Sequence, residues 1–185
     1  DTSSLQYEND SLMSDTGCTD DYGIACCVSM MEIGKEMQFF GARCNLAKTL
    51  LLALNEGKDE LTGTLVVPGV KPLSAGPLQL AEVQERFKQT MEFIAEQYVN
   101  TMDVIHYMHD KYYYERAQLA FMDSNVKRNM AFGLAGLSVV ADSLAAIQYA
   151  QVIPERNEQG LTIGFKVEGE YPKYGNDDDK VDSIA

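Results

Sequence analysis

The chain has 185 residues, of which 45% are hydrophobic and 23% are charged, and its formal net charge is -13. This length and composition predict a single globular domain with a sizeable core. The negative charge opposes contact with a phosphate backbone, so we expect no nucleic-acid partner. No apolar run approaches the roughly 18 residues that a bilayer crossing requires, and residues 1–10 lack the pattern of a signal peptide, so we also expect no membrane association.

The four cysteines are too few and too irregularly spaced for the disulfide framework of a small secreted domain. They favour a reducing compartment, and the predicted location is cytoplasmic. The sequence contains neither a C-x-x-C pair nor a Cys/His set with zinc spacing, so we predict no metal site. The cysteines are Cys18, Cys26, Cys27 and Cys44.

The first part of the chain is predicted to change from irregular to regular structure. Residues 1–22 are polar and predict an irregular surface segment, whereas residues 23–31 are small and apolar and predict a buried extended segment or a tight loop. Apolar residues at helical spacing then predict a helix from Leu46 to Leu54, with Gly57 as its C-terminal glycine. Prolines and glycines in residues 60–77 predict a loop with one short strand at residues 64–67.

The strongest periodicity predicts one long amphipathic helix, with Glu82 near its start and Lys111 near its end, as the helix dipole favours. Its length would be roughly 50 Å, which is more than a domain of this size needs and indicates a larger parent protein. The residues predicted to share its apolar face are Leu80, Val83, Phe87, Met91, Ile94, Tyr98, Met102, Ile105, His109 and Tyr112.

Two histidines on this helix, His106 and His109, lie near Asp103 and Asp110, which is one arrangement that can bind a metal. A second pair of ligands is not identifiable, and His109 lies on the apolar face. We therefore favour partly buried, hydrogen-bonded histidines.

The last third of the chain is predicted to contain a glycine-rich apolar stretch, a helix and a strand. The Gly-x-x-Gly pattern in residues 130–137 has neither the lysine of a phosphate loop nor the third glycine of a dinucleotide fingerprint, so it predicts close backbone packing. A helix is predicted at residues 142–149, with Asp142 capping its start. Alternating residues predict a half-buried strand at residues 161–168.

Several segments together carry the motifs of a known family. The segment GIACCVS at residues 23–29, followed by GK-x-MQFFGAR-x-NLAK at residues 34–48, is similar to the cysteine loop of the pyruvate formate-lyases, a family of glycyl radical enzymes. The resemblance continues through IHYMHDKY at residues 105–112, GLS with ADSL at residues 136–144, and EGEYP at residues 168–172. It therefore covers nearly the whole chain.

The two adjacent cysteines distinguish this chain within the wider superfamily. From composition alone Cys26 and Cys27 would be structural, because cysteine usually packs as a small hydrophobe. Glycyl radical dehydratases and decarboxylases typically have a single cysteine with a glutamate two residues after it. In this chain the residue two positions after Cys26 is Val28, and Cys27 lies between them. The pairing favours acyl transfer from a 2-keto acid.

The resemblance implies a role for each site residue. Cys27 would relay a hydrogen atom to the glycyl radical, and a thiyl radical on Cys26 would cleave pyruvate, leaving an acetyl group that coenzyme A collects. Arg43 would bind the substrate carboxylate, and Phe40 would wall a dry pocket. The chain departs from the family pattern at Met30, where proline is usual and would stiffen the loop, and at Cys44, where alanine is typical.

The resemblance also implies a fold and partners. The fold would be α/β, as part of a barrel of two antiparallel half-sheets surrounded by helices, with the cysteine loop at its centre. Residues 1–185 would be a central segment of that domain. The radical glycine and a second carboxylate-binding arginine would lie outside it, so we expect no cofactor in this segment and no turnover by it alone. Expected partners are pyruvate or 2-ketobutyrate, coenzyme A, a radical-SAM activating enzyme and a second copy in a homodimer.

A different class of function stays open, namely a non-catalytic helical interaction module or an inactive fragment that inherited this sequence. It predicts that the Cys26 thiol is no more reactive than that of Cys18.

Overall fold

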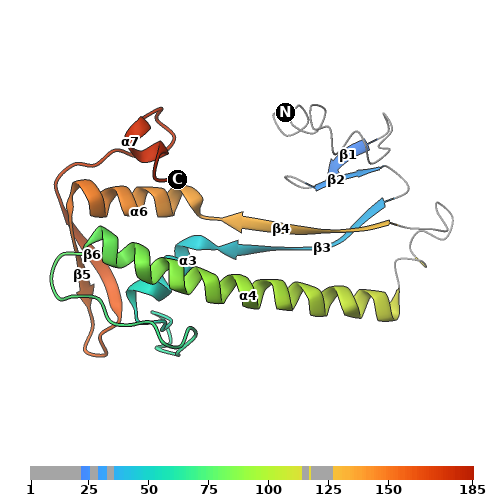
Figure 1. Cartoon of the computed structure of the whole chain (residues 1–185), viewed down its shortest axis with the longest axis horizontal. Helices are drawn as coiled ribbons and strands as arrows, with labels where there is room; N and C mark the ends of the chain where they lie inside the picture. Colours follow the sequence, from blue (N-terminus) through green and yellow to red (C-terminus); the bar gives the residue numbers. More distant parts are fainter. Residues whose placement is uncertain (1–21, 26–28, 33–35, 114–116, 118–126) are drawn as a thin grey trace. The chain divides into compact units, whose positions relative to one another are not determined.

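The computed structural model describes residues 22–25, 29–32, 36–113, 117 and 127–185 (Figure 1). The chain divides into two compact units, which are described separately. The first comprises Asp1–Arg43 and Asp103–Gly133, and the second comprises Cys44–Met102 and Leu134–Ala185. None of the helices in the described ranges has a stretch that is both long and apolar enough to cross a bilayer.

The strands of the first unit form two small sheets. Strand β1 (Tyr22–Ala25) pairs with β2 (Ser29–Glu32) in an antiparallel hairpin whose register aligns Ile24 with Met30 and Ala25 with Ser29. Strand β3 (Glu36–Asn45) pairs with β4 (Lys127–Ala135), and both strands extend by two residues into the second unit. The apolar segment predicted at residues 23–31 is therefore a hairpin in its described parts.

The second unit contains most of the helices. They are α3 (Leu46–Leu54), the first part of α4 (Leu80–Tyr112), α6 (Leu137–Tyr149) and the short α7 (Asp179–Asp182). An antiparallel hairpin of β5 (Gln151–Arg156) and β6 (Thr162–Glu168) completes the unit. The buried residues at its centre come from α3, α4, α6, β5 and the loop before α4, and they are Leu50, Ala53, Leu54, Leu78, Val83, Phe87, Val140, Leu144, Ala146, Ile147 and Val152.

The long helix predicted from periodicity is confirmed as α4, which has 33 residues. Val83, Phe87, Met102 and His109 on its predicted apolar face are buried. Tyr112 is the last residue of the helix and is 61% exposed, so the described residues do not cover this face at its C-terminal end.

Helix α6 begins earlier than predicted, at Leu137 instead of residue 142. Gly136 precedes it with a φ of +86°, and a Cβ there would lie 3.2 Å from the Cβ of Ala47, so only glycine combines this backbone with this close approach. Asp142 consequently lies inside the helix, and its carboxylate accepts a hydrogen bond from the Tyr174 backbone at 2.7 Å. Its predicted role as a helix cap is wrong.

The strand predicted at residues 64–67 is also absent, although these residues lie in the described part of the chain. A single bridge joins Lys58 and Leu65. The N–H groups of Val66 and Val67 both donate to the Gly57 carbonyl, at 2.8 and 2.9 Å, so a loop contact replaces a strand ladder.

Strand β6 is confirmed near its predicted position, but the prediction that it is half-buried is wrong. Its apolar residues Ile163, Phe165 and Val167 are 68%, 41% and 42% exposed. They alternate along one face, as a strand requires, but the described residues cover that face only in part.

The C-terminal end of α3 is tied to the β5–β6 hairpin by two side chains. Asn55 is buried; its Oδ1 accepts from the Thr162 backbone N–H at 2.9 Å, and its Nδ2 donates to the Leu51 carbonyl at 3.0 Å. Arg156 donates to the Leu54 carbonyl at 3.0 Å and to the Gly160 carbonyl at 2.8 Å. Carbonyls at a helix end need such partners, so these contacts fix the hairpin to the helix.

We expect the Asn55→Ala substitution to lower the free energy of unfolding by about 1–3 kcal/mol, because it leaves the buried Thr162 N–H without an acceptor. Urea unfolding of the chain measures this change. The matched control is Asn176→Ala, whose exposed side chain donates one bond to the Lys173 carbonyl and whose loss should cost about 0.5 kcal/mol or less. Equal effects of the two substitutions would contradict the stabilising role of the buried Asn55 side chain.

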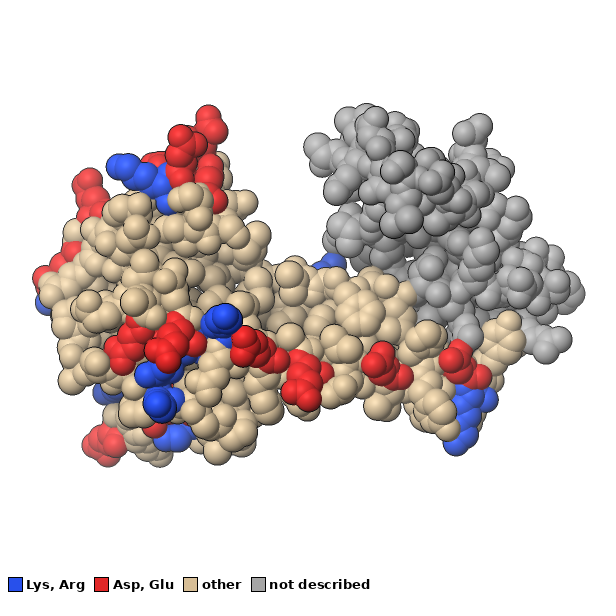
Figure 2. Space-filling view, viewed as in Figure 1, with Lys and Arg blue, Asp and Glu red and all other residues tan. Residues whose placement is uncertain are grey.

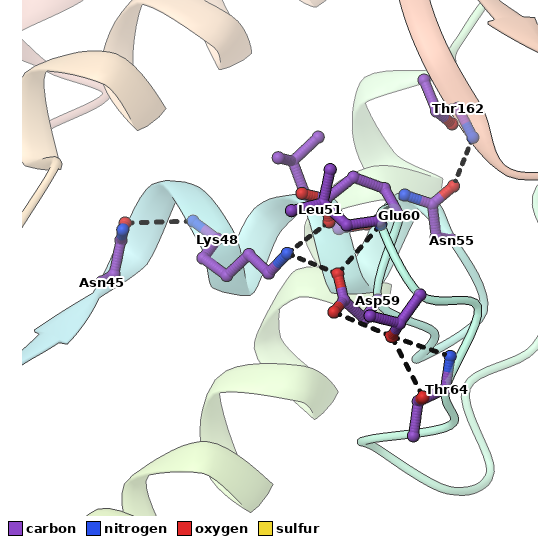
Figure 3. A network of polar contacts seen from close by, with 10 residues as sticks. Asn45, Lys48, Leu51, Asn55, Asp59, Glu60, Thr64 and Thr162 are labelled. Carbon is purple, nitrogen blue, oxygen red and sulfur yellow. Dashed lines mark hydrogen bonds and ion pairs between the residues drawn. The ribbon is translucent and has the colours of Figure 1, made fainter.

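An ion-pair network ties the start of α3 to the loop that follows it (Figure 3). The Asn45 side chain caps the helix by accepting from the Lys48 N–H at 3.1 Å. The Lys48 ammonium then donates to Asp59 at 2.8 Å and to Glu60 at 2.5 Å. The hydrogen bond from Lys48, followed by that from the Leu61 N–H, lowers the pKa of Asp59 to about 2.

This shift predicts an acid-sensitive loop. Because folding lowers the pKa of Asp59, its contribution to stability is present above about pH 4, the ordinary pKa of aspartate, and is lost as the pH falls towards about 2. A carboxyl NMR titration should show this low pKa, and Lys48→Met should raise it towards the ordinary value. An unchanged titration in Lys48→Met would show that Lys48 is not the cause.

Candidate active site

The predicted catalytic residues, Cys26 and Cys27, lie outside the described residues. The structure describes the strands that flank them in the sequence: β1 ends at Ala25, and β2 begins at Ser29. Met30 lies within β2 opposite Ile24. The pyruvate formate-lyases that the sequence resembles usually have a proline at this position. A methionine retains the backbone N–H that a strand ladder uses, which a proline lacks.

Arg43, the predicted carboxylate ligand, lies near the end of β3 and is exposed. Its aliphatic chain lies close to Gly133 on β4: a Cβ built on this glycine would be 2.9 Å from the Arg43 Cγ. Arg43 thus lies at the surface of a two-stranded sheet. The N–H donors of its planar guanidinium are of the kind that bind a carboxylate with two parallel hydrogen bonds.

Phe40 also lies on β3, but its side chain is outside the described part of the structure. Side chains of a regular strand alternate between its two faces, so positions 40 and 43 lie on opposite faces unless the strand departs from regular pleating between them. That Phe40 and Arg43 line one pocket stays a prediction.

The two histidines of α4 have different surroundings. His109 is 8% exposed, and the half-exposed His106 lies 3.9 Å from the Asp110 carboxylate, one helical turn away. Among the residues that the structure describes, no three His, Cys, Asp or Glu side chains form a group that could hold a metal ion.

Cys44 is a partly buried free cysteine next to Arg43 in the sequence. It lies at a shallow pocket of about 310 Å³ between α3 and α4, which Lys48 and Tyr98 also line. The pocket is largely apolar, and Lys48 is already paired with Asp59 and Glu60. We assign no chemistry to it.

An apolar groove of about 410 Å³ runs between α3, α6 and the β5–β6 hairpin. Two of its polar lining groups already have partners: Asp142 accepts from the Tyr174 backbone N–H, and the Ser143 hydroxyl donates to the Val139 carbonyl at 2.6 Å. No convergent reactive groups line it, so it is not the candidate site. Sequence reasoning missed it because helices and strands far apart in the chain form it.

The surface charge agrees with the acidic composition. Figure 2 shows acidic side chains along α4 and over the second unit, interspersed with fewer basic ones. The hydrogen bond from Lys166 lowers the pKa of the exposed Glu168.

Comparisons with known proteins show the class to which the chain belongs. The family model described as "Pyruvate formate lyase-like" matches residues 1–185, so the chain is a member of the pyruvate formate lyase-like family. It is 56% identical over 185 residues to formate acetyltransferase 1 of Escherichia coli (strain K12). That match covers the whole of this chain and 24% of the relative.

The family resemblance inferred from sequence motifs is therefore confirmed. The mixed α/β class is confirmed too, since the described residues include both helices and strands. The described strands form three two-stranded sheets and no closed barrel, so the barrel architecture stays a prediction.

Proposed function

We propose that this chain is the cysteine-carrying segment of a formate C-acetyltransferase, which converts pyruvate and coenzyme A to acetyl-CoA and formate. The observation that carries the proposal is the adjacent pair Cys26–Cys27 in a chain that belongs to the pyruvate formate lyase-like family over its whole length. The name of the relative, formate acetyltransferase 1, supports the same reaction. Because the chain spans about a quarter of that relative, the activity is proposed for a longer polypeptide.

The proposed reaction divides a difficult carbon–carbon cleavage into two steps. A radical on a glycine outside this chain takes a hydrogen atom from Cys27, which in turn takes one from Cys26. The resulting Cys26 thiyl radical adds to the carbonyl carbon of pyruvate, and the bond to the carboxylate carbon breaks. Cys26 is left as an acetyl thioester, and the formate radical anion takes a hydrogen atom from a cysteine thiol, which returns the radical to the protein. The thiol of coenzyme A then accepts the acetyl group and restores the Cys26 thiol.

In this proposal Arg43 holds the substrate carboxylate with two parallel hydrogen bonds, and Phe40 excludes water from the pocket. The exposure of Arg43 at the end of β3 supports its role, because the side chain can reach a substrate. A substrate with one more methylene, 2-ketobutyrate, carries the same carboxylate and carbonyl and is a candidate for the same site.

The rest of the family arrangement is part of the proposal. It comprises a barrel with the cysteine loop at its centre, a radical-SAM activating enzyme that generates the glycyl radical, a homodimer, and a cytoplasmic location. The isolated 185-residue chain is expected to have no turnover, because it would lack the radical.

A chimera tests the proposal directly. The matching 185 residues of the E. coli relative are replaced by this chain, and the chimera is activated under anaerobic conditions. We expect formate and acetyl-CoA from pyruvate and coenzyme A, with 2-ketobutyrate assayed in parallel. A chimera that is folded and carries the glycyl radical, measured by electron paramagnetic resonance, yet forms no formate from either substrate would show the proposal to be wrong.

A further inference from the structure

Gly133 of β4 lies directly against the side chain of Arg43 on the paired strand β3. A Cβ built on Gly133 would lie 2.9 Å from Arg43 Cγ, 3.7 Å from its Cδ and 3.2 Å from the carbonyl oxygen of Ala42. The first distance is shorter than real Cβ contacts. Because the backbone of Gly133 is not in the left-handed region, space and not backbone conformation requires a glycine here.

We infer that Gly133 is a positioning residue for Arg43: the absence of a side chain at position 133 lets the methylene chain of Arg43 lie close to the Gly133 backbone, and this packing fixes where its guanidinium is presented. The inference rests on the proposed function, in which Arg43 binds the substrate carboxylate. It gives a role to the first glycine of the Gly-x-x-Gly pattern, about 90 positions away from Arg43 in the sequence.

The position of the contact within the arginine gives the inference its physical basis. Cγ is two bonds from the Arg43 Cα, so it cannot move away without rotation about χ1. The staggered rotamers are about 120° apart, and such a rotation carries the guanidinium to a different place. The new methyl group would also lie 3.2 Å from the Ala42 carbonyl oxygen, a backbone atom of β3, so a shift of the methyl group has little room.

The test uses the activated chimera with the Gly133→Ala substitution. We expect the KM for pyruvate to rise about 10-fold or more, with a smaller change in kcat and no change in the KM for coenzyme A, because a carboxylate clamp displaced by an ångström or more binds its substrate poorly. The matched control is Gly164→Ala in β6. There a new Cβ would meet only the flexible end of Glu155, at 2.9 Å from Oε2, and kinetics should not change.

A double-mutant cycle separates positioning from a general structural effect. Gly133→Ala should have no further effect on the KM for pyruvate once Arg43→Ala has removed the guanidinium. If Gly133→Ala does not fold, Arg43→Ala in the same protein should restore folding, because it removes the Cγ contact; a failure to restore it would overturn the inference.

The outcomes distinguish this inference from the function on which it rests. If Arg43→Ala leaves the KM for pyruvate unchanged, the proposed carboxylate role fails, and the positioning role fails with it. If Arg43→Ala raises that KM and Gly133→Ala does not, the carboxylate role stands and the inference about Gly133 is wrong.

Discussion

Replacing either Cys26 or Cys27 by serine is expected to lower formate production by the activated chimera about 1000-fold or more. The physical reason is that the O–H bond of serine is too strong for its hydrogen atom to be transferred in the relay. In addition, a serine at position 26 has no sulfur on which the acetyl thioester can form. The glycyl radical should still form, because the radical lies outside this chain. Formate and acetyl-CoA are measured together with the radical signal, so that a failure of activation is not mistaken for a failure of chemistry.

Cys18→Ser provides the same chemical change at a cysteine without a proposed role, and it should retain activity. Peptide mass spectrometry of the unsubstituted chimera, treated with pyruvate in the absence of coenzyme A, should find the acetyl group on Cys26. An acetyl group on Cys27 would show that Cys27 carries the acetyl group and that Cys26 is the hydrogen-atom relay. Full activity in either cysteine variant would contradict the mechanism.

The elements that the sequence predicted well are those whose pattern is local and long. The periodicity of α4 extends over 33 residues, so a few exceptions such as Tyr112 do not obscure it. The start of α6 was misplaced because Gly136 interrupts an apolar run, although the buried residues Val140, Leu144 and Ile147 already follow helical spacing.

The candidate site shows the limit of reasoning from one sequence. The roles of Cys26, Cys27 and Arg43 came from motif resemblance, and helical or strand periodicity did not indicate them. Gly133 could not be connected with Arg43, because the pairing of β3 with β4 joins residues far apart in the chain. The Gly-x-x-Gly pattern indicated close packing at Gly133, but a single sequence does not identify the residue that packs there.

The exposed face of β6 was missed for a different reason. Alternating apolar residues predict that one face is covered, but they do not identify what covers it. The chain spans 24% of the relative it matches, and a protein of the relative's length has further residues that can pack against such a face. Burial therefore cannot be inferred from the pattern of one strand alone.

Gly57→Ala is expected to lower the free energy of unfolding by about 3 kcal/mol or more. Gly57 has a φ of +78°, which costs a non-glycine residue about 1 kcal/mol or more. In addition, its new Cβ would lie 1.8 Å from the Val67 carbonyl oxygen, a backbone atom that cannot move alone. Relief requires the loop to separate, which breaks the hydrogen bonds from Val66 and Val67 to the Gly57 carbonyl. Urea unfolding of the 185-residue chain measures the change.

Gly160→Ala isolates the part of this loss that comes from the contact. Its φ of +77° matches that of Gly57, but a Cβ there meets nothing within 4 Å. Both substitutions therefore place an alanine at nearly the same positive φ, and only Gly57→Ala adds the contact with Val67. We expect Gly160→Ala to cost about 1 kcal/mol, so the difference between the two variants measures how firmly the loop after α3 is held against the helix end. Equal losses would mean that the loop moves away at no cost, and the close packing of Gly57 against Val67 would then contribute nothing to stability.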